Sequence, residues 1–130
     1  MAAMAFREPN QVRWVGTRPG HNGTQVIAGG TATNTVTILW TVTAGKTLHI
    51  TYFSLAMRSG AVTAECSISV RNGADVYQYS IVNIGTVASD HGELAAALSV
   101  PIEVPAGYDV YVASDSANLK AYGTIHGWEE

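Results

Sequence analysis

Two stretches with the same layout decide the fold: TVTAGKTLHI at residues 41–50 and EVPAGYDVYV at residues 103–112. In both, an Ala-Gly pair is followed by one large side chain and then by a run in which every second residue is apolar. Gly45 and Gly107 can adopt a positive φ without steric cost, and Pro105 fixes the approach to the second turn. The two stretches therefore indicate equivalent turns at the rim of one β architecture, and not a repeated catalytic loop.

The runs around these turns alternate with a period of two, as a half-buried β-strand requires. TVTILWTV at 35–42 and TAECSISV at 63–70 place an apolar side chain at every second position. Cys66 falls on the apolar face, so we interpret it as a small core residue and not a nucleophile. The side chains predicted to face the core are Val36, Ile38, Trp40, Val42, Leu48, Ile50, Ala64, Cys66, Ile68, Val70, Val110 and Val112.

Further strands are predicted on both sides of these runs. Asn72-Gly73 between alternating segments is a hairpin signal, because both residues tolerate positive φ, and Gly73 is therefore a predicted turn residue. ELAAALSV at 93–100 has a helix-like composition ended by Pro101, but its neighbours are strands and we expect it to be extended. About eight strands at intervals near a dozen residues predict an all-β fold, a single antiparallel β-sandwich.

The first part of the chain has a different composition. Pro, Gly and Asn interrupt it and no period persists, so residues 1–23 are predicted to form an extended N-terminal arm and residues 24–130 the β-sandwich domain. Residues 1–34 carry a net charge of +2 and residues 35–130 one of −5. Trp14 has no local core to receive it, so it either folds back on its own domain or inserts into a partner. The predicted partner-binding residues of the arm are Arg7, Arg13, Trp14 and Arg18.

Composition narrows the class of protein. Three arginines spread along the arm are too sparse for a nucleic-acid footprint. No stretch is apolar enough to suggest a membrane span, and the first ten residues lack the pattern of a signal peptide. Charged residues make up 13% of the chain, which leaves much of the surface to Ser, Thr, Ala and apolar side chains. Such a surface favours assembly into an oligomer with covered faces.

Catalytic and metal-binding motifs are absent from the sequence. It contains no phosphate loop, dinucleotide fingerprint, nucleophile elbow or His-Glu-x-x-His motif, and the four histidines are scattered singly. The densest polar cluster is Asp90-His91-Gly92-Glu93, which could hold a hard cation or perform acid and base chemistry. It lacks the repeated carboxylates of a calcium loop, and we interpret it as a solvated turn. We expect no catalytic residues, no metal and no cofactor.

Tyrosines offer a second kind of recognition surface. Tyr77 and Tyr79 are two residues apart and are predicted to share a face of their strand, while Tyr111 lies on the opposite face from Val110 and Val112. An exposed tyrosine row could stack on sugars or form a subunit contact. The alternative is that Tyr77 and Tyr79 belong to the core of the sandwich.

The segments WTVTAGKTLHITYFSLAMRSG and VPIEVPAGYDVYVASDSANLKAYGTIHGWEE give the chain a resemblance to a known family. Over residues 34–130 it resembles the small decoration (cement) proteins of tailed bacteriophage capsids, which have a jelly-roll or tumour-necrosis-factor-like β-sandwich. The resemblance implies a homotrimer that binds the major capsid protein, without a cofactor, nucleic acid or membrane as partner.

From this resemblance we expect a structural, non-enzymatic virion protein on the capsid surface, made in the host cytoplasm. It would stabilise joints between major capsid subunits, with the arm docking on neighbours. The alternative is a carbohydrate- or receptor-binding head domain of a phage fibre or tail protein, using exposed tyrosines and the loops around Asn72, Asp90 and Asp115. A small enzyme built on Asp90 and His91 is a third reading.

Overall fold

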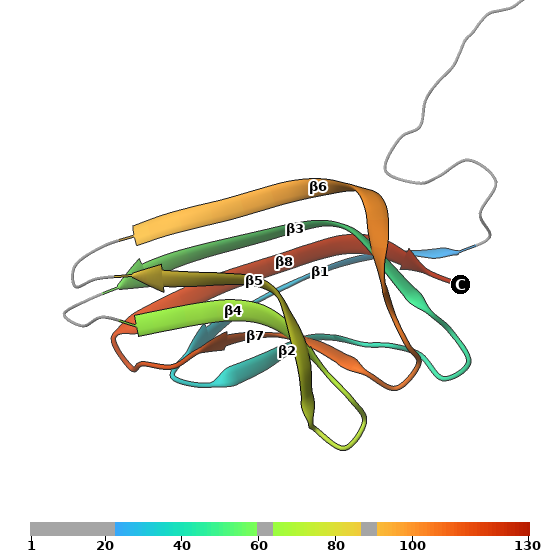
Figure 1. Cartoon of the computed structure of the whole chain (residues 1–130), viewed down its shortest axis with the longest axis horizontal. Coiled ribbons are helices and arrows are strands. Elements are labelled where there is room, and N and C mark those ends of the chain that lie inside the picture. Colours follow the sequence, from blue (N-terminus) through green and yellow to red (C-terminus); the bar gives the residue numbers. More distant parts are fainter. Residues whose placement is uncertain (1–22, 60–63, 87–90) are drawn as a thin grey trace, which may run out of the picture.

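The computed structural model describes residues 23–59, 64–86 and 91–130, and within them the chain forms eight strands in two sheets (Figure 1). Sheet A has the order β1-β8-β3-β6 and sheet B the order β2-β7-β4-β5, with every pairing antiparallel. This is the strand order of a jelly roll, so the all-β sandwich prediction is confirmed. The strands are β1 (Thr24–Thr33), β2 (Val36–Thr41), β3 (Leu48–Ser59), β4 (Ala64–Arg71), β5 (Tyr77–Thr86), β6 (His91–Val104), β7 (Asp109–Ser114) and β8 (Leu119–Glu129).

The core lies between the inner faces of the two sheets. Alternate residues of β3, β4, β7 and β8 are buried there over most of their length, as the period of two requires. Among the predicted inward residues, those of β3, β4 and β7 are buried: Leu48, Ile50, Ala64, Cys66, Ile68, Val70, Val110 and Val112. The described residues contain no helix that is long and apolar enough to cross a membrane.

The prediction for β2 was wrong in part. The pairing of β2 with β7 shifts by one residue between Ile38 and Trp40, which makes Leu39 the extra residue of a β-bulge. As a result Leu39 is buried, whereas Val36 and Ile38, predicted to face the core, are 45% and 47% exposed. A one-residue shift moves every side chain before it to the other face of the sheet.

The two Ala-Gly turns lie side by side. The amide of Lys46 donates to the Thr43 carbonyl, and Gly45 has φ 77°. In the second turn the amide of Tyr108 donates to the Pro105 carbonyl, and Gly107 has φ 80°. Both glycines thus occupy the third position of a type II turn, which requires positive φ. The Gly107 amide also donates to the Val42 carbonyl at 2.9 Å, which joins the two turns.

One other connection differs from its prediction, and the segment before Pro101 agrees with its prediction. The hairpin between β4 and β5 is present, but the residue with positive φ is Asp75 and not Gly73, which lies in the same turn. Asn72 organises this turn because its side-chain oxygen accepts hydrogen bonds from the amides of Ala74 and Val76. The prediction that residues 93–100 are extended is confirmed: β6 runs through Pro101 to Val104, with a register shift against β3 in this part of the strand.

Candidate functional site

The outer face of sheet A carries a line of polar and aromatic side chains along its two central strands. Because Leu119, Ala121 and Ile125 of β8 point into the core, the residues between them point outward. The same holds for β3, where Leu55 and Met57 are buried. Antiparallel pairing then places these outward residues opposite one another: Lys120 with Arg58, Tyr122 with Ala56, Thr124 with Ser54 and His126 with Tyr52.

A cavity of about 450 Å³ opens on this face. The rings of Tyr52 and His126 stand in it with centroids 4.9 Å apart and planes tilted by 49°. The Thr51 hydroxyl donates to the His126 carbonyl at 3.4 Å, at the bulge where β3 shifts its register. The full lining is Gln25, Thr51, Tyr52, Ser54, Ala97, Thr124, His126 and Gly127. This lining combines two aromatic rings, several hydroxyls and one side-chain amide with two small residues, Ala97 and Gly127.

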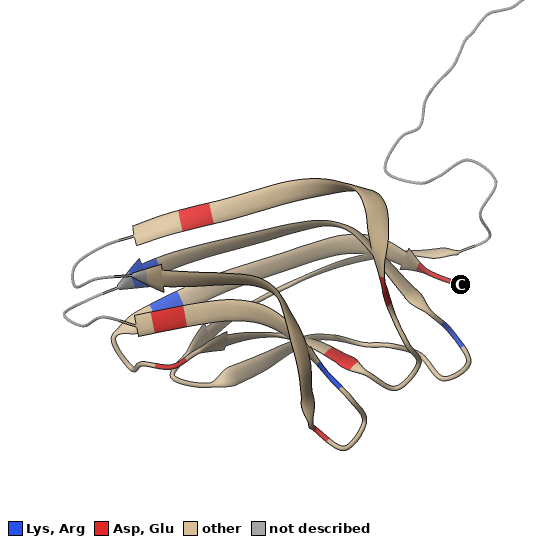
Figure 2. Cartoon of the chain, viewed as in Figure 1, with Lys and Arg blue, Asp and Glu red and all other residues tan. Residues whose placement is uncertain are grey.

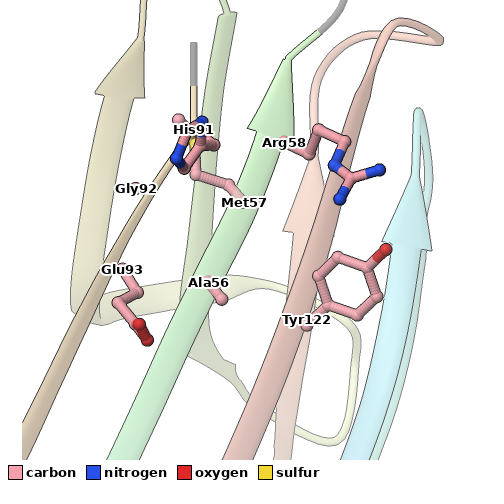
Figure 3. Close-up of a pocket in the computed structure, with 7 residues that line it drawn as sticks. All are labelled: Ala56, Met57, Arg58, His91, Gly92, Glu93 and Tyr122. Carbon is pink, nitrogen blue, oxygen red and sulfur yellow. The ribbon is translucent and has the colours of Figure 1, made fainter.

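A second cavity, of about 330 Å³, lies further along the same strands (Figure 3). Arg58 stands directly opposite both Lys120 and His91, so that three basic side chains form one row across β8, β3 and β6. The Lys120 ammonium lies 5.7 Å from the centroid of the Tyr122 ring. The cavity is lined by Ala56, Met57, Arg58, His91, Gly92, Glu93 and Tyr122.

Aromatic stacking and two carboxylates surround His49 at the opposite end of this face. The His49 ring stacks on Trp128 with centroids 4.8 Å apart and planes 8° from parallel. Its Nδ1 lies 3.7 Å from a carboxylate oxygen of Glu103, and its Nε2 lies 3.4 Å from one of Glu130. The charge of this cluster therefore depends on protonation of His49.

The outer face of sheet B has a different character. The Arg71 guanidinium lies 3.0 Å from Asp109 and 3.3 Å from Asp75, and 5.4 Å from the centroid of the Tyr111 ring. The Thr41 hydroxyl donates to the other Asp109 oxygen at 2.6 Å. The charges at this end of the face are therefore compensated within the sheet. Figure 2 shows that charged residues gather near the strand ends and in the turns, while the middle of both sheets is largely uncharged.

The predicted tyrosines do not share one face. Two bulges in β5 place Tyr79 opposite Val70, an inward residue, and Tyr77 opposite Arg71, which faces outward. Tyr77 is 57% exposed and Tyr79 37% exposed, so neither is an ordinary core residue. Burial, together with the nearby Tyr108, raises the pKa of Tyr79. Tyr111 lies on the outer face of sheet B and is half-buried beneath Arg71.

The remaining predicted sites are partly outside the described residues. This applies to Arg7, Arg13, Trp14 and Arg18 of the arm and to Asp90. His91 and Glu93 form the start of β6 and not a turn. Within residues 23–59, 64–86 and 91–130, no group of three metal-ligating side chains comes together.

Cys66 is a buried thiol on the inner face of β4. It is 2% exposed, and burial, with a smaller contribution from Asp115, raises its pKa to about 11. Since the thiolate is the nucleophile, this environment suppresses the reactivity of Cys66.

Sequence reasoning missed the outer face of sheet A. Tyr52, Arg58, Lys120, Tyr122 and His126 were not singled out, although the period of two was recognised in both of their strands. Taking every second residue of TYFSLAMR and LKAYGTIH would have selected them. Which strands are neighbours, and hence that the two sets form one surface, depends on long-range pairing.

Comparison with known proteins gives one finding about the fold. No family model matches the chain, and no curated protein is similar to it. A solved structure described as a pentameric capsid protein isolated from metagenomic phage sequences is similar, with a TM-score of 0.45 and 18% sequence identity. The similarity covers 80% of this chain and 59% of that one, so the present chain spans less than two thirds of its length. A likeness at this identity concerns the fold.

Proposed function

We propose that this chain is a structural protein of a tailed bacteriophage virion, which decorates the outer surface of the capsid and performs no reaction. Its β-sandwich associates with copies of itself, as a homotrimer, and binds the major capsid protein at joints between subunits. Two features support this proposal. The segments that resemble capsid decoration proteins lie in the sandwich, and the sandwich has the jelly-roll strand order that the resemblance implies.

The observation that carries the proposal is a set of exposed apolar side chains on the two edge strands of sheet B, β2 and β5. Val36 and Ile38 of β2 and Tyr77 of β5 are 45%, 47% and 57% exposed. Between them lies a row of serine hydroxyls, with Ser67 bonded to Ser69 and Ser69 to Ser80, both at 2.9 Å. Exposed aliphatic and tyrosine side chains, with charges already compensated nearby, are typical of the centre of a protein interface. We assign this face to self-association.

The arm supplies the contact with the capsid in this proposal. Residues 1–34 are basic and contain Trp14, the kind of side chain that anchors interfaces from a buried pocket. The body of residues 35–130 carries a net charge of −5, so a second copy of this chain, or a capsid subunit with acidic grooves, attracts the arm. Separate surfaces for self-association and for capsid binding allow both to be occupied together.

The test compares three variants of the full chain by sedimentation and by single-particle imaging of virus particles. Ile38→Glu should convert the protein to monomers, because a carboxylate buried in an apolar interface is strongly unfavourable. Deleting residues 1–23 should leave the oligomer intact and abolish binding to the particle. Val100→Glu is the matched control, since Val100 of β6 is 76% exposed and lies on the other sheet.

All three variants should keep the β-sheet circular dichroism spectrum of the parent chain. An Ile38→Glu protein with unchanged sedimentation would remove the role of sheet B, and an arm-deleted protein that still decorates particles would remove the role of the arm. Absence of the protein from particle surfaces would overturn the proposal as a whole.

A further inference from the structure

Two permanent positive charges stand directly opposite each other on the outer face of sheet A. Arg58 of β3 pairs with Lys120 of β8, and both side chains are exposed. Like charges in directly opposite positions of a sheet are destabilising. Among the residues that the structure describes, neither of them forms a salt bridge. A fold tolerates such a pair at little cost when an anion binds between the two charges.

The two cavities of this face are neighbours along β3 and β8, and together they are called the depression here. Ala56 and Tyr122 line the smaller cavity, and the next outward residues of the same strands, Ser54 and Thr124, line the larger one. From Lys120 to His126 along β8 the distance is about 20 Å, at the rise of an extended strand. One end of the depression is therefore cationic, and the other is aromatic and rich in hydroxyls.

The chemistry of the aromatic end indicates a neutral, polyhydroxylated group. Its lining has no Lys, Arg, Asp or Glu side chain. The Tyr52 and His126 rings offer apolar faces for the C–H side of a sugar ring. The amide of Gln25 and the hydroxyls of Ser54 and Thr124 can bond to sugar hydroxyls in both directions.

We propose that the outer face of sheet A binds an acidic oligosaccharide. Its uncharged rings occupy the cavity around Tyr52 and His126, and its carboxylate or sulfate group lies between Arg58 and Lys120. A nucleic acid fits less well, because duplex binding relies on many phosphate contacts and this face has two permanent cations with Glu93 beside them. This site lies on sheet A, and the surface proposed for self-association lies on sheet B. The protein can therefore bind a glycan as an oligomer.

The test is an NMR titration of the isotope-labelled full chain with oligogalacturonate and with its fully methyl-esterified form. Esterification removes the charge and keeps the sugar rings. The acid should bind more tightly than the ester, and both should shift the amide signals of β3 and β8. In Arg58→Gln/Lys120→Gln, affinity for the acid should fall by about tenfold or more, the loss expected from charge-assisted hydrogen bonds. Affinity for the ester should not change.

Variants at the other end separate the two halves of the site. Tyr52→Ser should weaken binding of acid and ester alike, and its folded state is checked by its dispersed NMR spectrum. Lys46→Gln is the control for the loss of one positive charge from the protein as a whole, since Lys46 is an exposed cation in a turn away from the two cavities. Equal binding of acid and ester by the parent chain would overturn the proposal. So would an unaffected double variant, shifts confined to sheet B, or no binding of either sugar at millimolar concentration.

Discussion

Glu129 is a buried carboxylate that ties the end of β8 to β2 and to the turn that follows it. It is 6% exposed and accepts hydrogen bonds from the Trp40 indole at 2.9 Å, the Thr43 amide at 2.8 Å and the Thr43 hydroxyl at 2.9 Å. Burial alone raises the pKa of Glu129, but these hydrogen bonds and the nearby Lys46 together outweigh it and lower the pKa. The ionised form is thus the one that the fold stabilises.

Acid should therefore weaken the fold through this residue. A carboxylate whose pKa is lowered in the folded state stabilises the protein above its unfolded pKa, and that contribution is lost as the pH falls through the folded pKa. Glu129→Gln should lower the free energy of unfolding by about 1–3 kcal/mol at neutral pH. The substitution replaces charge-assisted hydrogen bonds, and it places the NH2 group of Gln against the donors of Trp40 and Thr43. Urea unfolding at a series of pH values measures this.

The parent chain should lose more stability on acidification than Glu129→Gln does. Glu65→Gln, at an exposed carboxylate of β4, is the control and should behave like the parent. Parallel pH profiles for the parent and Glu129→Gln would show that another group controls acid stability.

At the scale of the strand, the period of two located β2, β3, β4 and β7, and bulges decided where the predicted faces were wrong. The strands around Ile50, Ile68 and Val110 were predicted with the correct inward faces. The bulge at Leu39 turned Val36 and Ile38 outward, and the bulges of β5 put Tyr77 and Tyr79 on opposite faces. An extra residue has no signature in a hydrophobic pattern, so these faces were predicted wrongly. A local sequence pattern also does not predict which strands pair, since neighbours such as β1 and β8 are far apart in the sequence.

The Ala-Gly turns are the elements in which a single backbone angle matters most. A Cβ on Gly107 would meet no atom within 4 Å, so replacing it tests the positive φ alone. Gly107→Val should lower the free energy of unfolding by about 1–3 kcal/mol, whereas Gly107→Asn should lower it less, because Asn tolerates this conformation. Urea denaturation compares the two. A fully stable Gly107→Val that no longer binds virus particles would give the turn a role in recognition.

At the scale of the molecule, the two faces of the sandwich have different compositions and were not equally predictable. The low charged fraction predicts that some of the surface is covered by other subunits, but it does not indicate which face. The structure separates a face of sheet B whose charges pair within the sheet from a hollowed face of sheet A, and the separation depends on which strands pair. The distance between the two sheets depends in turn on the side chains that meet in the core.

Gly123 sets that distance where β8 crosses β7 and β4. A Cβ on this residue would lie 3.0 Å from the Val112 Cβ and 3.3 Å from the Ile68 Cγ1, closer than ordinary contacts. Gly123→Ala should therefore destabilise the fold by about 1–3 kcal/mol, the usual cost of overpacking. In the double variant with Val112→Ala, part of this loss should be recovered, with a coupling energy of about 0.5–3 kcal/mol in a double-mutant cycle.

Gly85→Ala separates crowding from any general effect of adding a methyl group to a strand. The nearest atom to its Cβ would be the Glu65 Cγ at 4.0 Å, so this variant should be neutral or more stable by about 0.5–1 kcal/mol. Additive losses for Gly123→Ala and Val112→Ala would mean that the two positions do not crowd each other across the core. Coupled losses mean that the close contact of Gly123 with Val112 holds the two sheets at their distance.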